Sequence, residues 1–258
     1  MYPTKYHKPA DVEAAVAALG EEGKFLAGGQ TLLATMKQHL AAPTDLVDLR
    51  GLGLSGITAG PDGVTIGATT VHADVAQSGD VPAAIATLAG GVGDPQVRNM
   101  GTIGGSIANN DPAADYPAGV LGMGATVVTS KREIAADDFF QGLFTTALEE
   151  DEIVTAVRFP AVERAGYAKF KQPASRFCLV GVFVARTADG ARVAVTGAGE
   201  DGVFRHEGLE AALSANWSPE AVDGVEVSED GLMSDIHGDA AYRANLIKVM
   251  ARRAVAAS

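Results

Sequence analysis

The chain has 258 residues, a formal net charge of −12 and an apolar content of 47%, which is an ordinary composition for a soluble globular protein. The negative charge argues against a nucleic acid or an anionic membrane as partner, because both attract cationic surfaces. The single cysteine, Cys178, excludes a disulfide framework and a cysteine-ligated iron–sulfur cluster within the chain. No signal-peptide pattern or membrane-length apolar run is present, so we expect a cytoplasmic protein.

The N-terminal segment predicts two helices alternating with two strands. Apolar residues recur with helical spacing over residues 11–19, and a short strand over 24–27 runs directly into Gly28-Gly29. A second helix is expected over 31–41 and a second strand over 45–49. The glycine turn therefore stands at the start of a helix, where free backbone N–H groups attract anions.

A second glycine pattern, residues 51–56, matches the dinucleotide fingerprint G-x-G-x-x-G letter for letter. That fingerprint needs a helix directly after it. Here residues 57–67 indicate two short strands joined by a tight turn. We therefore interpret 51–56 as a loop and not as a Rossmann nucleotide site.

The middle of the chain alternates short helices and strands. Periodicity predicts helices over 71–77, 82–88 and 116–123, and strands over 125–129 and 153–159. Thr70 is expected to cap the first of these helices.

Between these elements lies a glycine-rich stretch, Gly101 to Asp115, with three glycines in its first five residues. We predict a loop whose successive N–H groups form an anion-binding nest, since glycine permits left-handed backbone and close approach to a ligand. Together with the turn at 27–31, it suggests a phosphate-bearing cofactor held between two glycine segments.

From Gly166 the pattern changes to strands in series followed by helices. Strands are predicted over 167–171, 179–186 and 192–196, with Asp189-Gly190 as a hairpin turn, and helices over 207–213 and 240–256. This order suggests a separate α+β domain beginning near residue 161. The fold class of the whole chain is α+β, or mixed α/β.

These motifs resemble the FAD-binding medium subunits of molybdenum hydroxylases, the carbon monoxide dehydrogenase and xanthine dehydrogenase family. The likeness lies in Ala27-Gly-Gly-Gln-Thr-Leu-Leu33, in residues 94–115, in the opening 2–9 and in the tail 234–243, so it covers nearly the whole chain. It implies a two-subdomain FAD-binding fold of the vanillyl-alcohol oxidase type over residues 1–160, with subdomains of about 1–53 and 54–160. A small C-terminal α+β domain over 161–258 completes the expected organisation.

The resemblance also implies which residues bind FAD, and it places none in a catalytic or metal-binding role. The expected contacts are Ala27, Gly28, Gly29, Gln30 and Thr31 at the pyrophosphate, Thr102, Gly104, Gly105 and Ser106 at the phosphates and ribityl chain, Asp115 near the ribityl–flavin junction, and Lys171 near the flavin ring. Asp115 as a helix cap and Lys171 as a solvated strand residue stay open as alternatives. His72 lacks metal-ligand spacing and is expected to be structural, as is Cys178.

The function implied by the resemblance is that of an oxidoreductase subunit. Substrate is oxidised at a molybdenum cofactor in a large partner, and electrons pass through [2Fe–2S] clusters of a small partner to this FAD and on to an external acceptor. A self-sufficient FAD-dependent oxidase or reductase of the same fold is the main alternative, but residues 161–258 leave little room for its substrate pocket. A module that has lost its flavin is disfavoured by the intact glycine segments.

Overall fold

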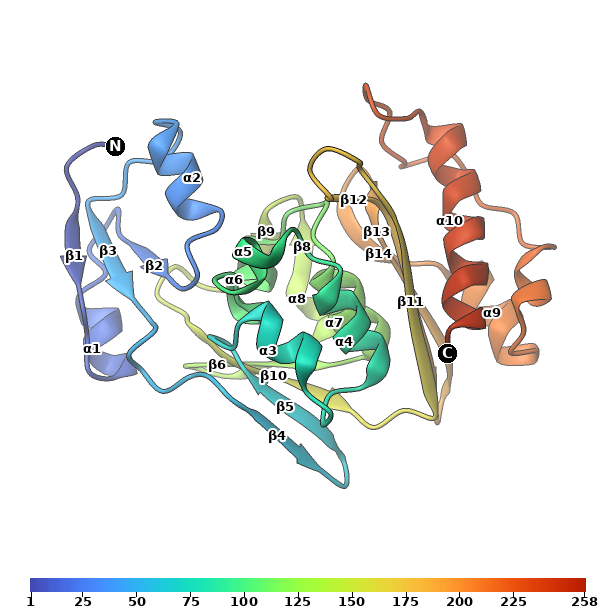
Figure 1. The fold of residues 1–258 in the computed structure, drawn as a ribbon, viewed down its shortest axis with the longest axis horizontal. Coiled ribbons are helices and arrows are strands. Elements are labelled where there is room, and N and C mark those ends of the chain that lie inside the picture. The colour runs from blue at the N-terminus through green and yellow to red at the C-terminus, as the bar shows by residue number, and fades with distance from the viewer.

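The computed structural model describes residues 1–258. Figure 1 shows three groups of elements side by side: a small N-terminal unit, a central group of helices with its own sheet, and a second sheet covered by the C-terminal helices. No helix is both long and apolar enough to cross a bilayer. The mixed α/β class predicted from the sequence is confirmed.

The N-terminal unit is a parallel sheet of three strands, in the order β1-β3-β2, with two short helices. Its elements are β1 (Lys5–His7), α1 (Val12–Ala17), β2 (Lys24–Leu26), α2 (Leu32–Lys37) and β3 (Asp45–Asp48). Helix α2 is shorter than the predicted 31–41. It ends at Lys37 because His39 takes a left-handed conformation, with φ of 62°, which ends helices.

The central group packs helices on an antiparallel sheet with the strand order β4-β5-β10-β6-β7. Its strands are β4 (Ile57–Gly60), β5 (Gly63–Gly67), β6 (Thr126–Thr129), β7 (Glu133–Ala135) and β10 (Val154–Pro160), with a separate ribbon of β8 (Phe140–Gly142) and β9 (Thr145–Thr146). Its helices are α3 (His72–Gln77), α4 (Ala83–Gly90), α5 (Pro95–Arg98), α6 (Ile103–Asn109), α7 (Tyr116–Met123) and α8 (Ala136–Phe139). As predicted, a strand and not a helix follows residues 51–56.

Two expectations about this central group are wrong. The glycine-rich stretch is not a loop throughout: seven of its fifteen residues, Ile103–Asn109, form α6, which the hydroxyl of Thr102 caps by accepting from the N–H of Gly105 at 3.2 Å. Its glycines serve packing, because a Cβ on Gly104 would lie 2.5 Å from the side chain of Ala68. Thr70 does not cap α3, since its hydroxyl bonds the backbone of Gly56 instead.

The C-terminal sheet is an antiparallel meander that is buried on both faces. It consists of β11 (Arg164–Lys171), β12 (Cys178–Thr187), β13 (Gly190–Gly199) and β14 (Gly202–Arg205), and is followed by α9 (Glu207–Ala215), a 3₁₀ turn (Pro219–Val222) and α10 (Ala240–Ala256). On one face Tyr167 and Phe183 join the core of the central helices. The other face forms a second core with α9 and α10, as the layers in Figure 1 show. The domain boundary at residue 161 stays a prediction, because this sheet is shared by both cores.

Helix α10 lies so close to β11 that a glycine is needed between them. A Cβ on Gly166 would lie 1.9 Å from the carbonyl oxygen of Ala254, whereas one on Gly224 would meet nothing within 4 Å. We expect Gly166→Ala to lower the free energy of unfolding by about 1–3 kcal/mol, because the helix must move away from the strand. Gly224→Ala is the matched control, and urea unfolding is the measurement. Equal midpoints for the two variants would contradict this packing argument.

Candidate functional site

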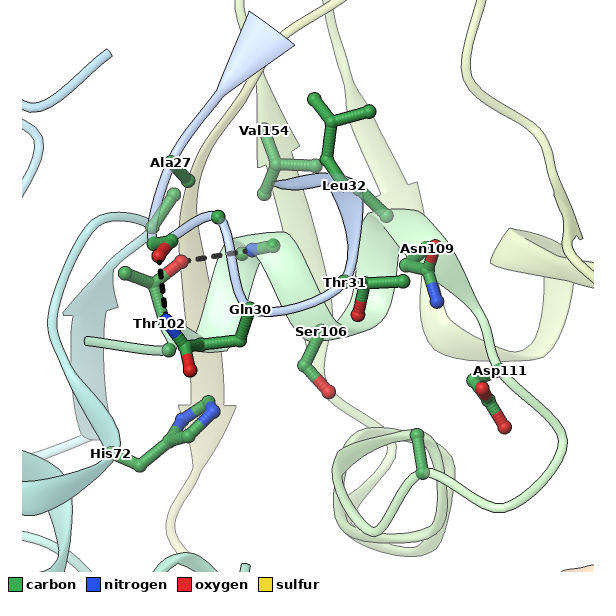
Figure 2. A pocket seen from close by; sticks show the side chains of 18 of the residues that line it. Ala27, Gln30, Thr31, Leu32, His72, Thr102, Ser106, Asn109, Asp111 and Val154 are labelled. Atoms are coloured by element: carbon green, nitrogen blue, oxygen red, sulfur yellow. Dashed lines mark hydrogen bonds between the residues drawn. The ribbon is translucent and has the colours of Figure 1, made fainter. Parts of the chain in front are cut away.

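A cavity of about 640 Å³ lies between the N-terminal unit, the central helices and the edge of the C-terminal sheet. This volume is within the usual range for a small-molecule or cofactor site. In Figure 2 the turn that carries Gln30 and Thr31 faces the helix that carries Ser106 and Asn109. The two glycine segments, which lie about seventy residues apart in the chain, are thus opposite walls of one cavity.

The first glycine segment presents a row of unused backbone donors to this cavity. Gly29, with φ of 72°, turns the chain from β2 towards α2. The N–H groups of Gly28, Gly29, Gln30 and Thr31 donate to no backbone carbonyl, while these four residues and Ala27 all line the cavity. Successive free N–H groups in a turn are the arrangement that binds an anion with several oxygens.

The second glycine segment contributes differently from the expectation. The N–H groups of Gly104, Gly105 and Ser106 already donate to Ala68, to the Thr102 hydroxyl and to the Thr102 carbonyl, respectively. The predicted anion nest is therefore absent from this segment. Its residues line the cavity as a smooth helix surface, and the missing side chain at Gly105, whose Cβ would lie 3.6 Å from Ala27, keeps the space between the two walls open.

Asp115 lines the cavity and is held by a buried charge pair. Its carboxylate accepts hydrogen bonds from the Tyr167 hydroxyl at 2.6 Å and from Nζ of Lys169 at 2.9 Å. The Lys169 side chain is only 3% exposed, and its Nζ also donates to the carbonyl of Arg176 at 3.3 Å. The open alternative of a helix cap does not hold, because the Asp115 side chain makes no capping bond.

Lys171, the lysine expected near the flavin ring, is exposed and does not line the cavity. Strand alternation alone puts residues two apart on the same face. Here the pairing register shifts between Phe170 and Lys171, and such a bulge redirects the end of a strand. Lys171 was expected from the resemblance to relatives, which gave no reason to single out Lys169; the other ten expected contact residues all line the cavity.

The C-terminal sheet also fixes the end of the glycine-rich stretch. The N–H of Gly197 donates to the carbonyl of Pro112 at 2.9 Å, and the Thr196 hydroxyl donates to the carbonyl of Ala114 at 2.7 Å. Asp115 is therefore placed from both sides: by the backbone of the preceding residues and by Lys169. The position of its carboxylate depends on the docking of the two cores.

Two exposed aromatic residues lie at the rim of the cavity and were also missed. Phe177, 56% exposed, follows Arg176 in the connection between β11 and β12. Phe144, 60% exposed, lies at the tip of the β8–β9 ribbon. Neither belongs to a periodic apolar pattern, so nothing in the sequence distinguishes them from core residues next to a turn.

His72 is the buried histidine of the cavity wall. It is 4% exposed, its Nδ1 has no hydrogen-bond partner, and its ring packs on Tyr116 with the centroids 5.2 Å apart. Burial, with a smaller contribution from the charge of Arg98, lowers the pKa of His72 to about 4. The imidazole is therefore neutral at pH 7. No group of three or more His, Cys, Asp or Glu side chains is arranged to hold a metal.

Comparison with known proteins gives a consistent result over the whole chain. Residues 2–162 match the family described as FAD binding domain in molybdopterin dehydrogenase. The carbon monoxide dehydrogenase medium chain of Hydrogenophaga pseudoflava is 34% identical over 98% of this chain and 96% of that protein. The nicotine 6-hydroxylase medium subunit of Paenarthrobacter nicotinovorans is 35% identical over 97% of this chain and 95% of that protein.

Solved structures agree with these sequence relatives. The structure of reconstituted CO dehydrogenase from Oligotropha carboxidovorans contains a chain that superposes with a TM-score of 0.90 at 34% identity, covering 100% of this chain and 98% of that one. Fold and cavity thus define a flavin-binding oxidoreductase subunit. The chain belongs to the family of FAD-binding domains of molybdopterin dehydrogenases, and its cofactor is FAD.

The buried pair predicts different outcomes for the two lysines near the end of β11. Lys169→Met leaves the buried Asp115 carboxylate without its cation, which costs about 3–5 kcal/mol of unfolding free energy. Lys171→Met removes an exposed side chain and is expected to change stability by at most about 0.5 kcal/mol. Urea unfolding of the two variants beside the wild type is the measurement. A larger loss at Lys171 would show that the wrong lysine has been paired with Asp115.

The lowered pKa of His72 predicts a loss of stability on acidification. Below the ordinary pKa of about 6.5 the unfolded chain binds a proton that the folded chain does not take up until about pH 4, so stability falls as pH decreases through this range. Compared with His72→Asn, the wild type is expected to lose about 2 kcal/mol more between pH 7 and pH 5. Urea unfolding of both proteins without cofactor at the two pH values tests this. Other groups titrate equally in both proteins, so only the difference between them reports on His72. If the unfolding free energies of the two proteins changed in parallel with pH, His72 would be excluded as the cause of the acid destabilisation.

Proposed function

We propose that this chain is the FAD-binding electron-transfer subunit of a molybdenum hydroxylase complex. It takes electrons from the [2Fe–2S] clusters of a small partner subunit and passes them through FAD to an external acceptor. The substrate is oxidised at the molybdenum cofactor of a large partner subunit. The observation that carries the proposal is the cavity between the two glycine segments, with its row of free N–H donors at Gly28–Thr31.

The residues of the cavity fit FAD. The free N–H groups at Gly28–Thr31 hold the oxygens of the pyrophosphate, and the Ser106 hydroxyl faces the same space from α6. Asp115, which is paired with Lys169, is an acceptor for hydroxyl groups of the ribityl chain. FAD bound there supplies reversible one- and two-electron redox chemistry, and the chain binds it, orients it and excludes water.

The carboxylates of the cavity favour a relay over a self-sufficient oxidase. Oxidation of an organic substrate needs a base positioned beside the reacting carbon. Asp115 is paired with Lys169, and Glu152 is paired with Arg132 at 3.1 Å. Asp111 accepts from the N–H of Ala113 at 2.8 Å. Two of the three cavity carboxylates, Asp115 and Glu152, are thus held in ion pairs, which supports a chain that handles electrons and not substrate.

The names of the relatives support the same assignment, because they are medium chains or subunits of a carbon monoxide dehydrogenase and a nicotine 6-hydroxylase. The two enzymes are named for different substrates, yet each has a medium chain or subunit that is similar to this chain. The organic substrate is therefore a property of the partner that holds molybdenum. The cytoplasmic location expected from the sequence stays a prediction.

The relay is tested with the purified full chain loaded with FAD. We expect it to accept electrons from dithionite and reduce an artificial dye, yet to oxidise no aldehyde, purine, N-heterocycle or carbon monoxide until the partner subunits are added. Gly105→Val is the control: its side chain fills the space between α6 and Ala27, so a folded protein without flavin is expected. Substrate-dependent dye reduction by the chain alone, at the rate of the complex, would refute the relay and favour the oxidase.

A further inference from the structure

One exposed aromatic residue is held in a backbone conformation that aromatic residues avoid. Four non-glycine residues have positive φ: His39, Asn110, Phe144 and Arg176. Asparagine adopts this region with little cost, but for a bulky residue it is a genuine outlier. Phe144, with φ of 52°, is also 60% exposed and lines the cavity. Phe144 therefore combines a strained backbone conformation with an exposed apolar ring.

The strain at Phe144 is maintained by Asn110, the residue that directly follows α6. Asn110 is 2% exposed, and its side-chain amide donates to the carbonyls of Gly142 at 2.8 Å and of Thr145 at 2.9 Å. Its own carbonyl accepts from the N–H of Phe144 at 3.1 Å. The side chain and the carbonyl of Asn110 thus form hydrogen bonds to residues on both sides of the ribbon tip, and these bonds fix the tip to the end of α6.

Folding alone gives no reason for this arrangement. A glycine at 144 would take the same φ without strain, and it would remove an exposed apolar surface. Strained residues that their surroundings hold in place are found at ligand clamps and active sites. The chain after the ribbon supplies further apolar wall to the same cavity through Leu148, Ile153 and Val154.

We propose that Phe144 is a cofactor-contacting residue whose ring stacks on a planar ring of FAD, and that Asn110 is the positioning residue that holds it there. The inference rests on the proposed function, since it requires FAD in the cavity. Both the adenine and the isoalloxazine present such a ring, and an aromatic side chain gains stacking energy on either. The strain at Phe144 is then compensated when the cofactor binds.

The test measures cofactor affinity and stability separately. If Phe144 served folding, its replacement would lower stability; if it contacts FAD, its replacement lowers the affinity for FAD and leaves stability unchanged. Phe144→Gly relieves the strain, so the melting temperature of the cofactor-free chain is expected to stay within ~2 °C of the wild type or to rise. Its affinity for FAD, measured by flavin fluorescence, is expected to fall about 5- to 100-fold, the range of one aromatic stacking contact. Phe144→Tyr keeps the ring and is expected to keep the affinity.

His39→Gly is the matched control. His39 has a similar φ of 62° and is exposed, but it does not line the cavity. Relief of strain there is expected to leave the affinity for FAD unchanged. Asn110→Ala is expected to lower both stability and affinity, because it releases the ribbon tip.

Two fragments of the cofactor identify the ring. ADP carries the adenine and FMN the isoalloxazine, so a loss of affinity in Phe144→Gly for one of them, measured by calorimetry, assigns the stacking partner. Unchanged affinity of Phe144→Gly for FAD, ADP and FMN would overturn the inference and leave Phe144 as a contact for a partner protein. Failure of the proposed function is a different result: the wild type itself would then bind no more FAD than Gly105→Val does.

Discussion

The buried ion pair between Asp115 and Lys169 is the interaction on which the geometry of the cofactor site depends. It joins the start of α7, in the central group, to β11, in the C-terminal sheet, and Tyr167 completes it from the same strand. A carboxylate and an ammonium buried without each other are each costly, so the pair makes correct docking of the two cores a condition of stability. Because Lys169 also holds the carbonyl of Arg176, the same docking places the rim segment that carries Phe177.

The two glycine segments have different physical tasks in the one cavity. In the first segment, glycine conformation frees a series of N–H groups for an anion. In the second, glycine allows a helix to lie against Ala68 and leaves space opposite Ala27. The two motifs look alike in the sequence but have different roles. The first donates hydrogen bonds, and the second leaves space for the ligand. A dinucleotide needs both, since its charged centre must be bound while its length must be accommodated.

The rim of the cavity combines rigidity with exposure. Asn110 and Lys169 are buried, and each fixes a surface segment that ends in an exposed aromatic residue, Phe144 or Phe177. Exposed rings on well-anchored segments lose little conformational entropy when a flat ligand or a protein surface covers them. Such a rim suits a chain that must hold a flavin and also face partner subunits.

The sequence by itself determined most of the elements and singled out the two glycine segments that line the cavity. Helices α7 and α10 end where periodicity predicts, and the strand after residues 51–56 excludes the Rossmann interpretation, because local hydrogen bonding and apolar spacing decide these features. Only the tertiary structure decided that residues 103–109 of the glycine-rich stretch form a helix, which packs so closely on Ala68 that Gly104 has no room for a side chain. It likewise decided that Lys169 and not Lys171 meets Asp115, and that Phe144 faces the cavity. A bulge in β11 and a hydrogen-bonded clamp from Asn110 set those directions, and both arise from contacts between residues far apart in the chain.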